Sequence, residues 1–409
     1  MTSVTGFLRV GRSRLALLFL AVAASSCGGE QSEAGRDGVM AARELSLPAG
    51  TGAAQPSLSS TPDGRVLLTW HEPDGDGHVL RLAALHDTTW SDPVTVAADR
   101  PFVVNWADFP SAVALGGERL AVHWLEQEGS DDYAYGVRIA FSEDGGRSWT
   151  APIRPHRDST ETEHGFVSML ATEDGALEAI WLDGRNFASD VQEMTLRSAR
   201  VAPDGLGPEH IIDARICDCC QTDAARTAAG TIVVYRDRSD GEIRDIAAVR
   251  RVNGTWSEPS IVHADGWEIA GCPVNGPAVA ASGDRVAVAW FTGARDTARV
   301  LVAFSSDGGA TFAAPLRVDG GRPAGRVDVL LLDDARALVS WIEGSGDAGE
   351  LRVRTMAADG AADEPVTIAA VTGARASGFP RMVRSGEGVV IVWTDAAAKR
   401  VRVARMSVD

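Results

Sequence analysis

The residue types most able to do chemistry are concentrated between Arg215 and Asp245. This stretch opens with R-I-C-D-C-C-Q-T-D and closes with R-D-R-S-D-G-E-I-R-D. It holds three of the five cysteines, which are soft metal ligands or redox groups. Its closing motif holds three arginines, which bind carboxylates or sulfates through paired N–H donors. These residues are Cys217, Cys219, Cys220, Arg236, Arg238 and Arg244. We therefore expect any reactive or binding centre to lie here.

The cysteines allow three interpretations. Together with Cys272 and the imidazole of His164 they form a soft-ligand set suited to copper or zinc, although C-x-C-C is not the familiar C-x-x-C zinc knuckle. In an exported protein, one or two structural disulfides also explain an even number of thiols, and the adjacent Cys219 and Cys220 cannot pair with each other without strain. The third interpretation is inert buried thiols.

The arginines allow two interpretations. Arg236, Arg238 and Arg244 could bind a carboxylate or sulfate in bidentate fashion. The alternating signs of R-D-R-S-D-G-E-I-R-D equally predict a surface ion-pair network in which the arginines neutralise neighbouring acids, and we favour the network.

The N-terminal residues indicate export. Residues 1–26 carry three arginines, then an apolar run too short to span a bilayer, then small residues, which is the order of a signal peptide. The small residues before Cys27 resemble a bacterial lipobox, and this resemblance implies lipidation of Cys27 and an anchor in a membrane. A plain secretory signal in which Cys27 is incidental is the alternative. Residues 27–42 are small, polar and aperiodic, as in a flexible tether. We expect an extracytoplasmic protein, in the periplasm or at the cell surface.

The charge of the chain argues against one class of partner. The formal net charge is −17, and loss of the three signal-peptide arginines would make it more negative. Phosphate backbones repel so acidic a chain, so we expect no nucleic-acid partner.

A repeat sets the elements that must position these residues. Alternating apolar residues that end in an aromatic recur seven times, with the aromatics 51 to 57 residues apart. The aromatics are Trp70, Trp124, Trp181, Tyr235, Trp290, Trp341 and Trp393. Each repeat alternates with period two between Gly, Asp and Pro, and leaves room for four strands. Radial repetition of such sheets predicts an all-β fold over residues 43–409, a seven-bladed β-propeller. The last repeat has only three strands, so we expect residues 43–48 to supply its fourth and close the ring.

Two turns carry a family resemblance. S-E-D-G-G-R-S-W (142–149) and S-S-D-G-G-A-T-F (305–312) match the S-x-D-x-G-x-[ST]-[WF] Asp box, so the chain resembles the sialidase-like propellers. Sialidases use an arginine triad, a tyrosine nucleophile with a glutamate, and an aspartate acid/base. This chain has no tyrosine after Tyr235 and no N-terminal R-I-P motif. Tyr235 itself fills the slot of the repeat tryptophans, which predicts a packing role.

The repeat register brings distant residues to one face. Cys217 and Cys272 each lie 18 residues before their repeat aromatic, in the loops that lead into the first strands of adjacent blades. These loops and the loops that leave the second strands share the ligand face of a propeller. We expect the cysteines to converge there, with His164 nearby and with stacking or polar groups around the rim. The expected rim residues are Trp106, Asp108, Trp267 and Asn275, and Trp267 could instead pack against the ring.

Two functions follow. The first is a lipoprotein that binds a small-molecule ligand or a soft metal at the cysteine and arginine residues, with or without redox chemistry. The second, implied by the resemblance, is a glycoside hydrolase in which the arginines grip an acidic sugar and Asp237 or Glu242 acts as acid/base. The absence of a late tyrosine favours the first.

Overall fold

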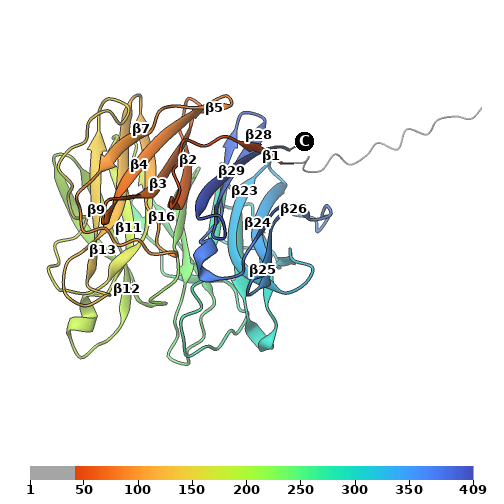
Figure 1. Cartoon of the computed structure of the whole chain (residues 1–409). Helices are drawn as coiled ribbons and strands as arrows, with labels where there is room; N and C mark the ends of the chain where they lie inside the picture. The colour runs from red at the N-terminus through yellow and green to blue at the C-terminus, as the bar shows by residue number, and fades with distance from the viewer. Residues whose placement is uncertain (1–41, 409) are drawn as a thin grey trace, which may run out of the picture. The chain divides into compact units, whose positions relative to one another are not determined.

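The repeats form seven antiparallel sheets, which are the blades of a propeller (Figure 1). The computed structural model describes residues 42–408, all of which belong to one compact unit. The expected signal peptide, Cys27 and nearly all of the expected tether lie outside the described residues. Within residues 42–408 no helix is long and apolar enough to cross a membrane.

The first four blades follow the chain in order. Blade 1 contains β2 (Ala54–Ser60), β3 (Val66–Asp74), β4 (Gly77–His86), β5 (Thr89–Trp90) and β6 (Val94–Ala97). Blade 2 contains β7 (Ser111–Gly116), β8 (Arg119–Gln127) and β9 (Tyr135–Ser142). Blade 3 contains β10 (His164–Ala171), β11 (Leu177–Asp183), β12 (Met194–Ala202) and β13 (Gly205–Ile216). Blade 4 contains β14 (Asp223–Thr227), β15 (Gly230–Arg236), β16 (Ile246–Val252), β17 (Thr255–Trp256) and β18 (Ser260–His263).

The remaining blades complete the circle. Blade 5 contains β19 (Ala278–Ser282), β20 (Arg285–Thr292), β21 (Arg299–Ser305) and β22 (Leu316–Arg317). Blade 6 contains β23 (Pro323–Leu331), β24 (Arg336–Ser345), β25 (Ala348–Ala357) and β26 (Val366–Val371). Blade 7 contains β27 (Arg381–Ser385), β28 (Gly388–Asp395), β29 (Arg400–Ser407) and β1 (Arg43–Leu45). Three 3-10 turns lie in loops: η1 (Arg185–Ala188), η2 (Ala294–Asp296) and η3 (Arg375–Ser377).

The innermost strands close a ring. Each of β2, β7, β10, β14, β19, β23 and β27 contacts the next, and β27 contacts β2. The N-terminal strand completes blade 7, because Arg43 pairs with Arg405 and Leu45 with Val403. The two ends of the described chain therefore lie side by side (Figure 1). The predicted seven-bladed propeller and its closure by an N-terminal strand are confirmed.

The repeat aromatics fix the packing between blades. All seven lie in the second strand of their blade and are at most 3% exposed. Several tryptophans donate to the acid two residues later, as Trp181 does to Asp183 at 2.8 Å. Tyr235 donates instead to Asp213 of the preceding blade at 2.6 Å. The recurrent acid after the aromatic is thus a structural partner of the indole in these blades.

The two Asp boxes have the expected local geometry. Asp144 accepts hydrogen bonds from the Ser148 amide at 2.9 Å and hydroxyl at 2.6 Å, and Asp307 does the same with Thr311. The Ser148 hydroxyl is the main reason that the pKa of Asp144 falls to about 2. Gly145 and Gly146 have φ of 75° and 90°, which glycine adopts without steric cost.

One blade departs from the four-stranded pattern: in blade 2 the fourth strand is reduced to a bridge between Ile139 and Ile153.

Candidate functional site

The cysteines come together where blades 4 and 5 meet. The Cys217 and Cys220 sulfur atoms are 3.1 Å apart, and the Cys217 and Cys219 sulfur atoms are 3.9 Å apart. All three sulfur atoms lie within 4.8 Å of one another. Cys272 reaches them from the loop before β19 and shares a hydrogen bond with Cys219. We call these four residues the cysteine cluster; all four are free thiols in the structure.

The surroundings favour negative charge on one sulfur. Burial raises the pKa of Cys217, but the hydrogen bonds that it shares with Cys219 and Cys220 outweigh burial and hold that pKa well below its usual value. The Arg244 guanidinium adds a bond of 3.3 Å to the Cys217 sulfur. Burial raises the pKa of Cys220, while the bond with Cys219 lowers the pKa of Cys272 to about 7. A lowered pKa favours the thiolate form of Cys217, which is the form that binds a metal ion.

The charged residues after β15 form an ion-pair network. Arg238 donates to Glu242 at 2.8 Å, and Arg244 donates to the other Glu242 oxygen at 2.9 Å. These bonds, from Arg238 first, lower the pKa of Glu242 to about 2. Asp218, which sequence reasoning did not single out, lies 3.5 Å from both guanidinium groups. The arrangement matches the self-neutralising alternative offered by the sequence.

Arg236 lies in the interior of the fold. It is 1% exposed and donates to the main-chain oxygens of Asn275, Arg244 and Phe291 at 2.6 to 3.0 Å. Its guanidinium lies 4.8 Å over the Trp267 ring. The Asn275 side chain accepts a bond of 2.8 Å from the Arg326 amide. Arg236, Trp267 and Asn275 thus join blades 4, 5 and 6 together.

A pocket opens beside the cysteine cluster. This mouth pocket has a volume of about 550 Å³ and is lined by Cys219 and Cys272 together with residues of blades 2 and 3. Trp106, Tyr133 and Phe187 provide aromatic surface, and Tyr133 is 68% exposed. Of the expected rim residues, Trp106 lines this pocket, whereas Asp108, Trp267 and Asn275 are outside its lining, as are Asp237, Glu242 and the three arginines.

The mouth pocket contains an acid that sequence reasoning missed. The Tyr135 hydroxyl donates to Glu163 Oε1 at 2.5 Å. Burial raises the pKa of Glu163 to about 8, so this carboxyl is protonated at neutral pH. Burial also raises the pKa of Asp237, which lies in the loop after β15. Glu163 belongs to an irregular loop that no repeat or motif marks, so no sequence signal could have found it.

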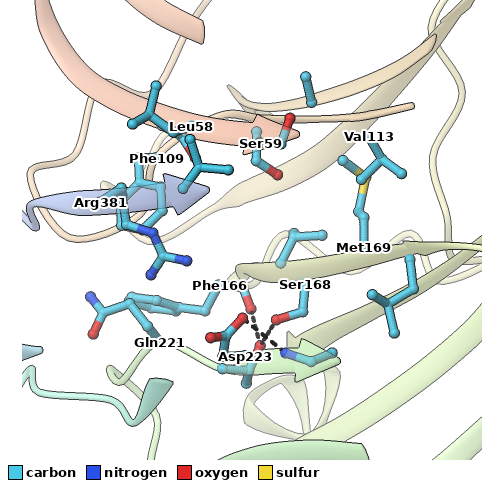
Figure 2. A pocket seen from close by; sticks show the side chains of 18 of the residues that line it. Leu58, Ser59, Phe109, Val113, Phe166, Ser168, Met169, Gln221, Asp223 and Arg381 are labelled. Atoms are coloured by element: carbon cyan, nitrogen blue, oxygen red, sulfur yellow. Dashed lines mark hydrogen bonds between the residues drawn. The ribbon is translucent and has the colours of Figure 1, made fainter. Parts of the chain in front are cut away.

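Asp108 lines a different hollow. A central channel of about 370 Å³ runs between the first strands of several blades, where Arg381 lies beside Phe109 and faces Asp223, Ser168 and Gln221 (Figure 2). Asp108 is 4% exposed in the wall of this channel. Burial raises its pKa to about 7.

The neighbours of His164 are not the cysteines that the sequence led us to expect. Its ring lies against His156 and Asp158 at the start of blade 3, and the group of thiols within 4.8 Å does not include it. The structure therefore brings the four cysteines together and places the histidine in a second cluster.

Several solved structures have a fold similar to that of the chain. No protein family and no curated protein matches the sequence. An ulvan lyase of polysaccharide lyase family PL25, solved with -[GlcA(1-4)Rha3S]-, matches with a TM-score of 0.56 at 10% identity over 88% of this chain and 95% of its own. The GH93 α-L-arabinofuranosidase of Fusarium graminearum, solved with arabinobiose, matches with a TM-score of 0.51 at 14% identity over 90% and 98%.

With the two Asp boxes in register, these matches establish the architecture. The chain has the fold of a sialidase-like β-propeller. A Hadza microbial sialidase is also similar, at 16% identity and a TM-score of 0.46, over 71% of this chain and 63% of the sialidase. Identities this low concern the fold alone.

Proposed function

We propose that the cysteine cluster binds one soft metal ion, copper(I) or zinc(II), in the wall of the mouth pocket. The observation that carries this proposal is the convergence of three sulfur atoms within 4.8 Å, with Cys272 beside them. Four sulfurs at ~2.3 Å from a tetrahedral ion lie about 3.8 Å apart. The Cys217–Cys219 separation of 3.9 Å already fits, and the Cys217–Cys220 separation of 3.1 Å would have to widen by less than 1 Å.

The same proposal includes the location of the protein. The basic, apolar and small-residue order before Cys27 supports export and lipidation at that residue. Outside the cytoplasm free thiols oxidise to disulfides, and a bound metal would keep them in the thiolate form. Labelling with a fatty acid tests the anchor: wild type should incorporate it and Cys27→Ser should not. Incorporation by Cys27→Ser, or none by wild type, would contradict the anchor without affecting the metal proposal.

Elemental analysis tests the metal site. The protein is purified anaerobically without chelators, supplied with copper(I) or zinc(II), and freed of excess ion. We expect the cluster to retain one ion, Cys219→Ser and Cys272→Ser to lose it, and Cys27→Ser, whose substitution lies outside the cluster, to keep it. Wild-type protein that retains no ion on the cysteines, with a native circular dichroism spectrum, would overturn the proposal and favour disulfides between the two loops.

A second candidate function rests on the other wall of the mouth pocket. Aromatic faces at Trp106, Tyr133 and Phe187, beside the protonated Glu163, suit a sugar ring, which stacks on aromatics and accepts hydrogen bonds. Two propellers of similar fold were solved with arabinobiose and with -[GlcA(1-4)Rha3S]-, which supports a glycan ligand.

A glycan panel tests this second function. Neutral and acidic oligosaccharides are titrated into wild type and into Tyr133→Ala, whose 68% exposed ring is unlike a core residue. We expect about fivefold weaker binding in the variant and unchanged thermal stability, because one stacked ring contributes on the order of 1 kcal/mol. Absence of binding across the panel by wild type would exclude the glycan ligand and leave the metal proposal standing.

A further inference from the structure

Two histidines and an aspartate form a buried cluster at the start of blade 3. His156 and Asp158 lie in the loop before β10, and His164 is the first residue of that strand. His156 is 3% exposed and His164 is fully buried. The two imidazole rings stack with centroids 4.1 Å apart and planes 5° from parallel. One ligand atom from each of the three residues lies within 4.8 Å of the others.

The hydrogen bonds of the rings fix which nitrogen atoms are free. His164 Nδ1 lies 2.9 Å from the Thr162 carbonyl oxygen, and His156 Nδ1 lies 3.2 Å from the Asp158 carbonyl oxygen. A carbonyl oxygen only accepts hydrogen bonds, so each Nδ1 carries the proton. In the neutral ring, Nε2 is then unprotonated and has a free lone pair. Neither Nε2 has a hydrogen-bond partner, although both are buried. Leaving such a buried atom unsatisfied destabilises the folded state.

Two carboxylates face the Nε2 atom of His164. Asp158 Oδ2 lies 3.0 Å from His164 Nε2, and Asp183 Oδ1 lies 3.7 Å from it. A carboxylate and a bare imidazole nitrogen present lone pairs to each other, so a cation belongs between them. A proton on His164 would satisfy that contact and would leave His156 Nε2 unpaired. A metal ion satisfies both ring nitrogens and the carboxylate together.

We propose that His156, Asp158 and His164 form a metal site, distinct from the cysteine cluster, for a borderline divalent cation such as Zn²⁺. Two Nε2 atoms and one carboxylate oxygen are a zinc-type donor set, and carbonyl groups that hold the Nδ1 protons are the usual support of zinc-bound histidines. Because the stacked rings are parallel, one of them must tilt for both Nε2 atoms to face the same ion. Asp183, which is 3.7 Å from His164 Nε2, is held by hydrogen bonds from Arg185 and Trp181.

The position of the site gives it a role. The loop that carries His156 and Asp158 also supplies Glu161, Thr162 and Glu163 to the mouth pocket. An ion held by both ends of this loop fixes the wall that carries Glu163. The site is thus structural, and it orders the pocket whatever ligand that pocket takes.

Zinc stoichiometry tests the proposal on the full chain. Wild type, His156→Asn and His164→Asn are loaded with Zn²⁺ alone, and zinc per chain is measured after removal of excess. We expect each variant to hold one zinc fewer than wild type, and the exposed-histidine control His210→Asn to lose none. Cys219→Ser in the same series reports on the cysteine cluster separately, so failure of one site is not failure of the other.

X-ray absorption spectroscopy on wild-type protein tests the site even if the histidine variants do not fold. Zinc bound in nitrogen and oxygen shells, in addition to any sulfur shell, supports the site. Sulfur ligands alone, or no retained zinc, would overturn it. Nitrogen NMR of the rings gives the competing result: a His164 that carries protons on both nitrogens in the presence of excess Zn²⁺ would show that a proton, not a metal, occupies the position.

Discussion

Asp108 Oδ2 accepts a hydrogen bond of 2.6 Å from the main-chain N–H of Phe166, 58 residues later, and so ties blade 2 to blade 3. The same relationship recurs twice around the ring. It joins blade 4 to blade 5 and blade 6 to blade 7, through Asp223 with Val279 at 2.9 Å and Asp328 with Met382 at 2.6 Å. Three carboxylates at the inner edge of the ring therefore link neighbouring blades in pairs: 2 with 3, 4 with 5 and 6 with 7.

The buried carboxyl of Asp108 predicts that the stability of the fold depends on pH. Burial raises the pKa of Asp108 to about 7, above its unfolded value. The folded protein then binds more protons than the unfolded chain between about pH 4 and pH 7, so stability is full below this window and falls as pH rises through it. Asp108→Asn, which keeps an acceptor and removes the charge, should make the fall smaller by about 2–4 kcal/mol.

Urea denaturation at pH 4.5 and pH 8 checks the Asp108 prediction. The matched control is Asp76→Asn in the exposed turn between β3 and β4, which should leave the pH dependence unchanged. An Asp108→Asn protein with the same pH dependence as wild type would show that the Asp108 carboxyl is not responsible.

The buried position of Arg236 predicts that its substitution lowers the free energy of unfolding and does not act through ligand binding. A lysine ammonium cannot reach the three main-chain oxygens that the Arg236 guanidinium satisfies, and buried acceptors would lose their donors. We expect Arg236→Lys to lower the free energy of unfolding by about 2–4 kcal/mol. The neighbouring Arg238→Lys, in a half-buried ion pair, should change it by less than about 1 kcal/mol. Equal effects in the two variants, measured by urea denaturation, would contradict this division of roles.

The sequence predicts what the repeat determines. Cys217 and Cys272 converge because each lies 18 residues before its repeat aromatic, so equal positions in adjacent blades become neighbours in the ring. Closure by residues near Arg43 follows in the same way, because the last blade lacks a strand. Registers of this kind depend on period and count, which the sequence shows directly.

Side-chain partners in the loops do not follow from the repeat. Arg236 and Arg238 are two residues apart in one motif, yet the first ends a buried strand and the second lies in the loop beyond it. His164 shares the register of the cysteines but turns toward His156, because the irregular loop before β10 brings that ring under it. Such loops have no period, so neither Glu163 nor His156 could be chosen beforehand.

The pairing of strand β1 with β29 predicts that β1 contributes to the free energy of unfolding. Leu45 and Leu47 pack against the core of blades 1 and 7, and Glu44 pairs with Arg402 at 2.5 Å. A chain that begins at residue 42 should match the full chain in stability. A chain that begins at residue 49 loses the strand and bares the edge of β29, and we expect it to unfold about 1–3 kcal/mol more easily. Equal urea midpoints for the two truncations would show that β1 does not close the ring in solution.

The cysteine cluster predicts an order of thiol reactivity that a metal should abolish. Without metal, a time course with iodoacetamide should modify the exposed Cys272 first, the half-buried Cys219 next, and the buried Cys217 and Cys220 last. If all four sulfurs bind one ion, copper(I) or zinc(II) should protect even Cys272, although its exposure is unchanged, and a chelator should restore the order. Mass spectrometry of the peptides, on Cys27→Ser protein to remove the fifth thiol, gives the rates. Protection of the other three with unchanged modification of Cys272 would mean that the ion is held within C-x-C-C alone, and that blade 5 supplies no ligand.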